Sequence, residues 1–307
     1  MPKEIFGANY PFLPRDEVLT FEEIERIARI FAAAGVSKLR ITGGEPLVRR
    51  NIEELVARLA QIPGIEDIAM TTNGSLLTAK KARALKDAGL KRITISLDSL
   101  DDDVFKSMND VNFPVSKVLQ AIDNAVAAGL EPVKIDTVVK RGVNDHTIIQ
   151  LASYFRHTGI IPRFIEFMDV GTTNGWRMED VVPAREIIEA IGSEWAIAPV
   201  EPNYYGEVAD RYRYLDGGGE FGIIASVTQP FCGTCTRARL SADGKLYTCL
   251  FGTHGHDFRE LLRSGASDEE IAAKLAGVWT NRADRYSELR TENTIYLRKV
   301  EMSRIGG

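Results

Sequence analysis

A recurring order of amphipathic helix, glycine and short apolar strand runs through residues 20–168 and restricts the folds open to this chain. Glycine suits the end of a helix because it adopts the left-handed conformation without a steric penalty. Strands that alternate with helices lie parallel, since each helix carries the chain back to the same edge of the sheet. The expected strands are residues 38–42, 67–72, 92–97, 133–139 and 163–168.

The helices between these strands begin and end at recognisable residues. Thr20 and Glu23 form a capping box at the start of a helix that ends at Gly35. Five strands are too few for a complete eight-stranded barrel, which takes about 250 residues. We therefore predict an incomplete barrel or an open parallel sheet, with functional residues at the carboxyl ends of the strands. The other helices are expected near residues 52–59, 78–89, 115–129 and 144–159.

The regular order stops near Gly171, and a second region begins there. Two hairpins are predicted, one closed by Gly217-Gly218-Gly219 and one closed by Ala242-Asp243-Gly244. We predict one domain over residues 1–170 and a second over residues 171–307. The hairpin strands are expected at 211–215, 221–227, 237–240 and 245–250, and helices near 184–191, 258–263 and 268–279.

The three cysteines of the chain flank the second hairpin, in the spacing Cys232-x2-Cys235-x13-Cys249. Closure of that hairpin is expected to bring them together. A disulfide framework normally uses an even number of cysteines, whereas three thiolates at this spacing favour zinc or an iron–sulfur cluster. Three protein ligands leave one metal position open, which is typical of a reactive site. A closed zinc site with His254 or His256 as the fourth ligand is the alternative.

Polar loops follow three of the predicted strands. They are Thr42-Gly43-Gly44-Glu45-Pro46, Thr71-Thr72-Asn73-Gly74 and Ser96-Leu97-Asp98. Each of them alone is also a common kind of turn. Because the carboxyl ends of parallel strands meet at one edge, the three loops together indicate a binding site there.

Three long cations occupy a parallel sheet that is normally buried on both faces. Arg40 and Lys134 lie inside strands, and Arg163 begins one. Such residues either form buried ion pairs, here with Glu166 or Asp136, or bind the phosphates of a ligand inside the barrel. The sequence alone leaves both interpretations open.

Two further arginines lie close after the second cysteine, in the stretch Arg237-Ala238-Arg239. If this stretch is extended, both guanidinium groups lie on the same face. They form either a solvated pair of charges or an anion site beside the predicted metal.

The net charge excludes one broad class of function. The 307 residues carry a formal charge of −5, whereas nucleic-acid binding generally needs a basic surface. No run of about 18 apolar residues is present, so no membrane-spanning helix is expected. The first residues do not resemble a signal peptide, and we expect a soluble cytoplasmic protein.

These motifs taken together resemble the GTP 3′,8-cyclases, the radical S-adenosylmethionine enzymes of molybdenum cofactor biosynthesis. The resemblance covers essentially the whole chain, and it is the combination that is specific. It rests on residues 38–46, 71–74, 96–98 and 163–168, on the cysteines with residues 236–240, and on the terminal Gly306-Gly307.

The resemblance implies an α/β fold, an incomplete (βα)6 TIM-like barrel, with a C-terminal α+β domain that carries an auxiliary cluster. That cluster would be a [4Fe–4S] cluster bound by Cys232, Cys235 and Cys249, with GTP as its further ligand. S-adenosylmethionine would bind a second [4Fe–4S] cluster in the barrel of the full-length family member. The implied contacts are Arg40, Thr71, Lys134, Arg163, Arg237, Ala238 and Arg239 for GTP, and Gly44, Ser96 and Met168 for S-adenosylmethionine.

The resemblance also implies a reaction and a partner. GTP would be cyclised to (8S)-3′,8-cyclo-7,8-dihydroguanosine 5′-triphosphate, with Arg304 as the catalytic candidate on a tail that enters the active site. Cyclic pyranopterin monophosphate synthase would take the product, and a homodimer is one possible assembly. A peptide-modifying radical enzyme with an auxiliary cluster, or a non-catalytic zinc-binding or partner-binding remnant, are the alternative functions.

One family motif is missing from the sequence. The family's barrel cluster is bound by C-x3-C-x2-C, and this chain has no cysteines besides the three already named. In the family that motif directly precedes a segment like the one that begins at Met1-Pro2, so the first barrel strand is expected to be missing too. Either the start codon has been assigned too far downstream or the gene is truncated, and we expect C-x3-C-x2-C to be encoded directly upstream. The chain as written is not expected to cleave S-adenosylmethionine.

Overall fold

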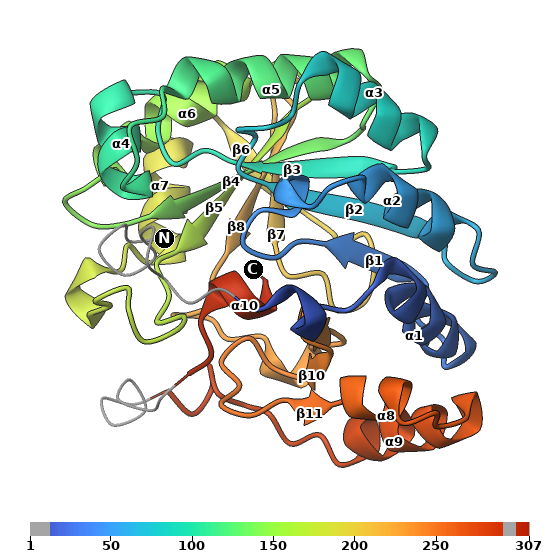
Figure 1. Cartoon of the computed structure of the whole chain (residues 1–307). Coiled ribbons are helices and arrows are strands. Elements are labelled where there is room, and N and C mark those ends of the chain that lie inside the picture. The colour runs from blue at the N-terminus through green and yellow to red at the C-terminus, as the bar shows by residue number, and fades with distance from the viewer. Residues whose placement is uncertain (1–12, 291–298, 307) are drawn as a thin grey trace.

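A curved sheet of eight strands, in the order β1-β2-β3-β4-β5-β8-β7-β6, dominates the computed structural model, which describes residues 13–290 and 299–306. Figure 1 shows helices on the outside of this sheet, with β10 and β11 below it; these two strands belong to a second sheet of order β11-β10-β9. The strands are β1 Lys38–Ile41, β2 Asp67–Thr72, β3 Arg92–Ser96, β4 Val133–Val139, β5 Ile161–Glu166, β6 Ile197–Val200, β7 Asp210–Tyr214, β8 Glu220–Ile224, β9 Arg239–Leu240, β10 Lys245–Tyr247 and β11 His256–Asp257.

The sheet is an incomplete barrel, as predicted. Strands β1 to β5 are parallel in chain order, and β8 continues the parallel set beside β5 with Arg163 opposite Gly222. The order begins at β1 and ends at β6, so the sheet does not close on itself. The strand β8 was predicted only as half of a hairpin, and its place in the barrel could not be read from that local pattern. The large sheet thus extends past residue 170, and the predicted domain limits stay a prediction.

The helices follow the sequence signals closely at their starts. The Thr20 hydroxyl accepts a hydrogen bond from the Glu23 N–H at 3.1 Å, and the Glu23 carboxylate accepts one from the Thr20 N–H at 2.8 Å, which is the predicted capping box. The α-helices are α1 Phe21–Ala33, α2 Ile52–Ala60, α3 Ala79–Asp87, α4 Asp102–Asn109, α5 Val115–Ala127, α6 Ile148–Phe155, α7 Ala184–Glu194, α8 Arg259–Arg263, α9 Asp268–Thr280 and α10 Met302–Ile305, and the 3₁₀ turns are η1 Arg15–Glu17, η2 Pro46–Val48, η3 Asp145–Thr147, η4 Met178–Asp180 and η5 Cys232–Thr234.

Three details differ from the prediction. The helix expected over 144–159 ends at Phe155, because Arg156 turns away to contact Asp216 and the Trp195 ring. The helix α4 was not predicted, although Asp101 caps it. Strand β5 ends two residues before the predicted end, since the Phe167 carbonyl accepts a hydrogen bond from the Trp176 indole and not from a neighbouring strand.

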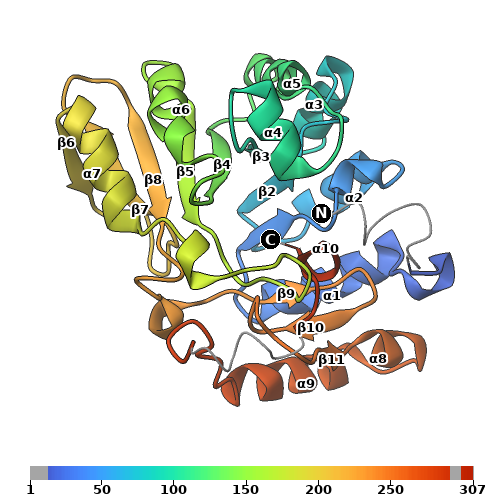
Figure 2. The ribbon, with the colours of Figure 1, turned by 90° about the vertical axis from the view of Figure 1, so that its left-hand side faces the viewer.

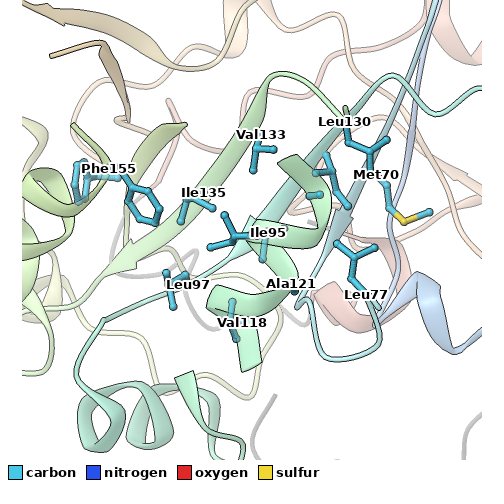
Figure 3. Packing of buried hydrophobic residues seen from close by; sticks show 14 of the residues in the cluster. Met70, Leu77, Ile95, Leu97, Val118, Ala121, Leu130, Val133, Ile135 and Phe155 are labelled. Atoms are coloured by element: carbon cyan, nitrogen blue, oxygen red, sulfur yellow. The ribbon is translucent and has the colours of Figure 1, made fainter. Parts of the chain in front are cut away.

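The core lies between the barrel strands and the helices that cover them. Figure 3 shows Ile95 of β3 and Ile135 of β4 packed against Val118 and Ala121 of α5, and all four are buried. Along β4 buried residues alternate with half-buried ones, starting at the buried Val133. Since successive side chains of a strand point to opposite faces, this alternation directs Lys134 toward the barrel interior. The apolar face thus fixes where the polar face points.

The C-terminal part is held by a smaller core. Leu246 of β10, Phe258 and Leu275 of α9 pack against Ile27 and Ile30 of α1. Strand β10 lies antiparallel between β9 and β11, with Leu246 opposite Leu240, so the second predicted hairpin is confirmed with shorter strands. This small sheet is therefore attached to the barrel through one face of α1.

Candidate functional site

The three cysteines lie in turns on either side of the β9–β10 hairpin. Cys232 begins η5, and the Cys235 N–H closes that turn on the Cys232 carbonyl at 3.2 Å. Cys249 follows β10 by two residues, and the pairing of Arg239 with Tyr247 brings it back toward Cys235. All three are free thiols and half-buried. The hairpin pairing thus returns the chain at Cys249 to the side of the hairpin from which Cys235 enters.

Two guanidinium groups converge on Cys235. Arg237 and Arg282 each donate a hydrogen bond to its sulfur at 3.2 Å, and Arg282 also binds its carbonyl at 2.7 Å. Burial acts to raise the pKa of Cys235, but the charge of Arg237 and the hydrogen bonds outweigh it and lower that pKa to about 7. Burial raises the pKa of Cys249, and repulsion from Asp284 and Cys232 adds to this. Cys235 is therefore the thiol best prepared to act as a thiolate ligand.

A buried donor beside these thiols lacks an acceptor. The Arg237 Nε is buried and has no hydrogen-bond partner among the described residues. An unsatisfied buried donor is costly, so an anion or an anionic cluster at this point would complete the site. Three thiols next to two guanidinium groups are donors that fit an iron–sulfur cluster.

A site for one metal ion is not formed here. In residues 13–290 and 299–306, no group of three or more His, Cys, Asp or Glu side chains lies close enough to hold a single ion. His254 is exposed and pairs with Thr253, while His256 lies in β11. Ligands of a four-iron cube bind separate irons and stand farther apart than the ligands of one ion. The assignment of the three cysteines as cluster ligands stays a prediction.

The predicted interior cations lie together inside the barrel. Arg40 donates hydrogen bonds to Thr71 at 2.8 Å and to Thr94 at 3.2 Å. Arg163, which is buried, forms an ion pair with Asp136 at 2.6 Å and reaches Thr94 at 3.5 Å. These cations were expected either to form buried ion pairs or to bind phosphates, and Arg163 forms the ion pair with Asp136.

Positive charge is in excess at this place. Arg40 is exposed by its accessible surface, yet many protein atoms lie around its guanidinium group, and this desolvation, followed by repulsion from Arg163, lowers its pKa to about 10. Burial and then the charges of Arg163 and Arg92 lower the pKa of Lys134 to about 8. An anionic ligand would relieve this repulsion.

A cavity of about 410 Å³ opens beside two of the cations. Lys134 and Arg163 line it together with Asn203 and Glu207, from the segment between β6 and β7. It lies at the amino ends of β4, β5 and β8, opposite to the strand ends where we expected the site. The site residues are thus divided between the two ends of the barrel.

The candidates for the adenosyl cofactor lie at the carboxyl ends of the strands. Ser96 is the last residue of β3, Gly44 follows β1 and Met168 follows β5. Glu45 fixes the first of these loops by accepting hydrogen bonds from Thr72 Oγ1 and from the Asn73 N–H, both at 2.7 Å. Because β1, β3 and β5 are parallel, these loops lie at the same end of the barrel, as predicted.

Loop-shaping residues also surround Met168 and Ser96. The Asn174 amide donates to the Met168 carbonyl at 2.7 Å. Asp98, two residues after Ser96, accepts from the Val138 N–H at 2.9 Å. Burial raises the pKa of Asp98 to about 6, opposed by that hydrogen bond and reinforced by the charge of Asp136.

The second arginine cluster and the tail lie on the C-terminal side. Arg239 begins β9, and burial followed by repulsion from Arg237 lowers its pKa to about 10, while Ala238 between them is exposed. Arg304 forms an ion pair with Asp243 at 2.6 Å. Gly306 lies against Thr42, and Gly307 lies outside the described residues.

Two residues of this site were missed from the sequence. Thr94 lies two positions before Ser96 in β3, and the two-residue period of a strand places both on the interior face. Arg282 follows α9 in a stretch without a recognisable motif, and only its contact with Cys235 reveals it.

Two family models match the chain. One, described as the radical SAM superfamily, matches residues 5–155, and the other, described as molybdenum cofactor synthesis C, matches residues 160–288. No helix in the described residues is long and apolar enough to cross a membrane.

Curated relatives match nearly the whole length. A GTP 3′,8-cyclase of Acidothermus cellulolyticus is 56% identical over 294 residues, which cover 94% of this chain and 81% of the relative. A GTP 3′,8-cyclase of Staphylococcus carnosus is 53% identical over 311 aligned positions, which cover 100% of this chain and 91% of the relative.

Solved structures agree with the fold at much lower identity. Streptococcus suis SuiB matches with a TM-score of 0.60 and 14% identity, over 92% of this chain and 70% of that chain. The protein anSMEcpe, solved with bound AdoMet, matches with a TM-score of 0.51 and 15% identity, over 85% of this chain and 74% of that chain. At these identities the likeness concerns the fold alone.

Proposed function

The chain belongs to the GTP 3′,8-cyclase family of radical S-adenosylmethionine enzymes, and we propose that its barrel and cysteine hairpin form the GTP site of such a cyclase. The observation that carries the proposal is the gathering of Arg40, Lys134 and Arg163, because among the described residues only Arg163 of the three forms an ion pair, with Asp136. A triphosphate supplies the negative charge that this interior lacks.

The chain's own residues would bind and orient the nucleotide. Arg40, with Thr71 beside it, Lys134 and Arg163 would neutralise the phosphates, and the cavity beside Lys134 gives them room. Arg237 and Arg239 would bind the nucleotide from the cysteine side, where the buried Arg237 Nε has no acceptor of its own. Cations in the barrel and beside the cysteines would hold the nucleotide from two sides. Such orientation of the substrate is the main contribution that a protein makes to cofactor chemistry.

The cofactor candidates follow the same division. Gly44, Ser96 and Met168 would contact S-adenosylmethionine at the carboxyl ends of the strands, and Cys232, Cys235 and Cys249 would hold the auxiliary cluster. When bound, the clusters and S-adenosylmethionine supply the one-electron chemistry and an iron site for the guanine base. Arg304, on the C-terminal tail, is the proposed catalytic residue. The product would pass to cyclic pyranopterin monophosphate synthase.

The number of cysteines limits how many iron–sulfur clusters the 307 residues can bind. The 307 residues contain three cysteines, and the proposed auxiliary cluster uses all of them. We propose that these residues alone bind GTP but do not cleave S-adenosylmethionine. We expect turnover only when a C-x3-C-x2-C segment is supplied in addition.

The test compares two proteins under strictly anaerobic conditions. The 307-residue chain and a version extended by a C-x3-C-x2-C segment are given GTP, S-adenosylmethionine and a reductant. We expect 5′-deoxyadenosine and a cyclised nucleotide from the extended protein and neither product from the shorter one. Turnover by the shorter protein would refute the assignment of the cluster ligands, and failure of both to bind GTP would refute the proposed function.

A further inference from the structure

The C-terminal segment 299–306, here called the tail strap, lies between the barrel and the cysteine hairpin. Figure 2 shows its helix α10 between the barrel strands and the sheet of β9 to β11, and Figure 1 shows the same position from the side. The strap contacts four separate parts of the chain. Lys299, Ile305 and Gly306 of the strap are buried, whereas Met302 and Arg304 are exposed. Terminal residues are poorly ordered unless other elements hold them.

The first anchor of the strap is Lys299. Its ammonium group binds Asp169 twice, at 2.8 Å to the carboxylate and at 2.9 Å to the carbonyl, and both residues are buried. The same carboxylate accepts hydrogen bonds from Arg290 at 3.0 Å and from the Tyr286 hydroxyl at 2.5 Å. Removing one partner of a buried, hydrogen-bonded charge pair leaves the other uncompensated, so this anchor holds firmly.

The second anchor is Glu301. Its carboxylate accepts from the Thr172 N–H and hydroxyl, both at 2.9 Å, and from the Thr173 hydroxyl at 3.0 Å. Gly171 has a φ of +66°, and a Cβ at that position would overlap the Glu301 carboxylate. The glycine is therefore required both by the backbone conformation and by the close approach of the strap.

Both anchors bind the loop that follows β5, directly after Met168. The strap then contacts the cysteine side, where the Val300 N–H donates to the Gly252 carbonyl at 3.3 Å. Gly252 belongs to the turn of Cys249, because its N–H binds the Cys249 carbonyl at 3.2 Å. One short segment thus joins the loop of an adenosyl-cofactor candidate to the turn of a cluster-ligand candidate.

The end of the strap makes two more contacts. Arg304 pairs with Asp243 in the turn of the β9–β10 hairpin, and Gly306 lies against Thr42 in the loop after β1. The strap therefore runs from the loop after the carboxyl end of β5 to the loop after the carboxyl end of β1.

We propose that Lys299 and Glu301 are positioning residues that fix the distance between the two halves of the site, by tying the cysteine turn at Gly252 to the loop at Asp169–Thr173. This inference rests on the proposed function, because it concerns how one protein holds GTP and the adenosyl cofactor in register. Neither residue touches the substrate in this proposal. They act through the loop and the turn that they join.

A substitution at Glu301 can test the attachment of the strap without changing the stability of helix α10. Glu301 precedes α10 as its N-cap, yet its side chain makes no capping hydrogen bond to that helix. Glu301→Ala therefore removes the anchor and leaves the capping of α10 unchanged. Glu301→Gln keeps an acceptor for the Thr172 N–H and is the conservative rescue. Glu189→Ala, which alters an exposed carboxylate on α7, is the matched control.

The first measurement is amide hydrogen exchange of the 307-residue protein. In Glu301→Ala we expect exchange to quicken about 10- to 100-fold in peptides covering 299–306 and the Thr172 amide, which is the factor for losing hydrogen bonds to a charged group. The peptide around Gly252 should quicken with them. Glu301→Gln and Glu189→Ala should exchange like the wild type. Unchanged exchange in Glu301→Ala would overturn the anchoring.

The second measurement is GTP affinity after anaerobic reconstitution of the auxiliary cluster, with thermal unfolding as a check on the global fold. We expect Glu301→Ala to bind GTP about tenfold more weakly and Glu301→Gln to bind it like the wild type. A released strap with unchanged GTP affinity would overturn the positioning role. Wild-type protein that binds no GTP would refute the proposed function, and hydrogen exchange would then decide the anchoring alone.

Discussion

The barrel wall and the cysteine region are stabilised in different ways. The barrel has one large apolar core, in which helices such as α5 cover β3 and β4, and its interior polar residues follow from strand periodicity. The cysteine region has a small apolar core and depends on contacts such as Arg282 to Cys235 and Lys299 to Asp169. The difference teaches that the barrel part of the proposed site is held by apolar packing, whereas the position of the cysteine part depends on a few polar contacts. Four predictions can break or sharpen this comparison.

The largest effect is expected in the barrel core. Ile95→Ala should lower the free energy of unfolding of the whole protein by about 2–5 kcal/mol, because it leaves a cavity between β3 and α5. Leu246→Ala in the small core should instead impair iron incorporation before it abolishes the fold. Urea unfolding and iron analysis of both variants test this, with Val126→Ala on the exposed face of α5 as the control. Equal loss of iron in both variants would contradict the division.

The next effect concerns the charge inside the barrel. Arg40→Met should weaken GTP binding about 10- to 100-fold, the usual cost of losing a hydrogen bond to a charged group, and should leave iron content unchanged. Equilibrium dialysis with the reconstituted protein measures it. Arg185→Gln on the exposed face of α7 is the control, and the same affinity in both variants would exclude Arg40 from the phosphate site.

The third effect is a pH dependence of stability in the barrel. The folded state raises the pKa of Asp98 from 3.8 to about 6, so wild-type stability falls as the pH rises from 4 to 6 and the carboxyl ionises. Asp98→Asn keeps an acceptor for the Val138 N–H and does not ionise. Its stability relative to the wild type should therefore increase by about 1–3 kcal/mol over that interval. Urea unfolding at several pH values measures this, with Asp123→Asn as the control. A stability difference between Asp98→Asn and the wild type that stays constant with pH would contradict the prediction.

The smallest effect is a pH dependence of GTP affinity. The pKa of Lys134 is lowered to about 8, and a phosphate beside it favours the charged amine. Affinity should be constant below pH 8 and should fall above it, at most about tenfold per pH unit, because binding then requires uptake of a proton. Lys134→Met should bind more weakly and lose this dependence. If Lys134→Met still shows this pH dependence, a group other than Lys134 is responsible for it.

Much of the barrel could be predicted from the sequence because local signals agree with the tertiary structure there. The strands at 67–72 and 133–139 have the predicted limits, and the capping box at Thr20 is present. Lys134 and Asp136 point inward because Val133, Ile135 and Val139 point outward, a consequence of the two-residue period. The parallel place of β8 was missed because its partners in β5 lie 59 residues earlier in the chain, and such a pairing leaves no local mark.

The cysteine region was predicted only in part. The spacing of Cys232, Cys235 and Cys249 indicated one neighbourhood and the hairpin explained it. Arg282 and Lys299 could not be predicted, since their partners are 47 and 130 residues away along the chain and no periodic pattern surrounds them. Contacts between single polar side chains depend on tertiary placement, which local sequence does not specify.

The central claim is that the barrel cations and the three cysteines form one GTP site. It is tested most directly by measuring iron and GTP bound per chain after anaerobic reconstitution, in the wild type and in Cys249→Ser. We predict about four irons, the content of one cubane cluster, and one GTP per wild-type chain, with loss of the iron and weaker GTP binding in the variant. Stoichiometric zinc without iron, or GTP binding that is the same in both proteins, would contradict the account.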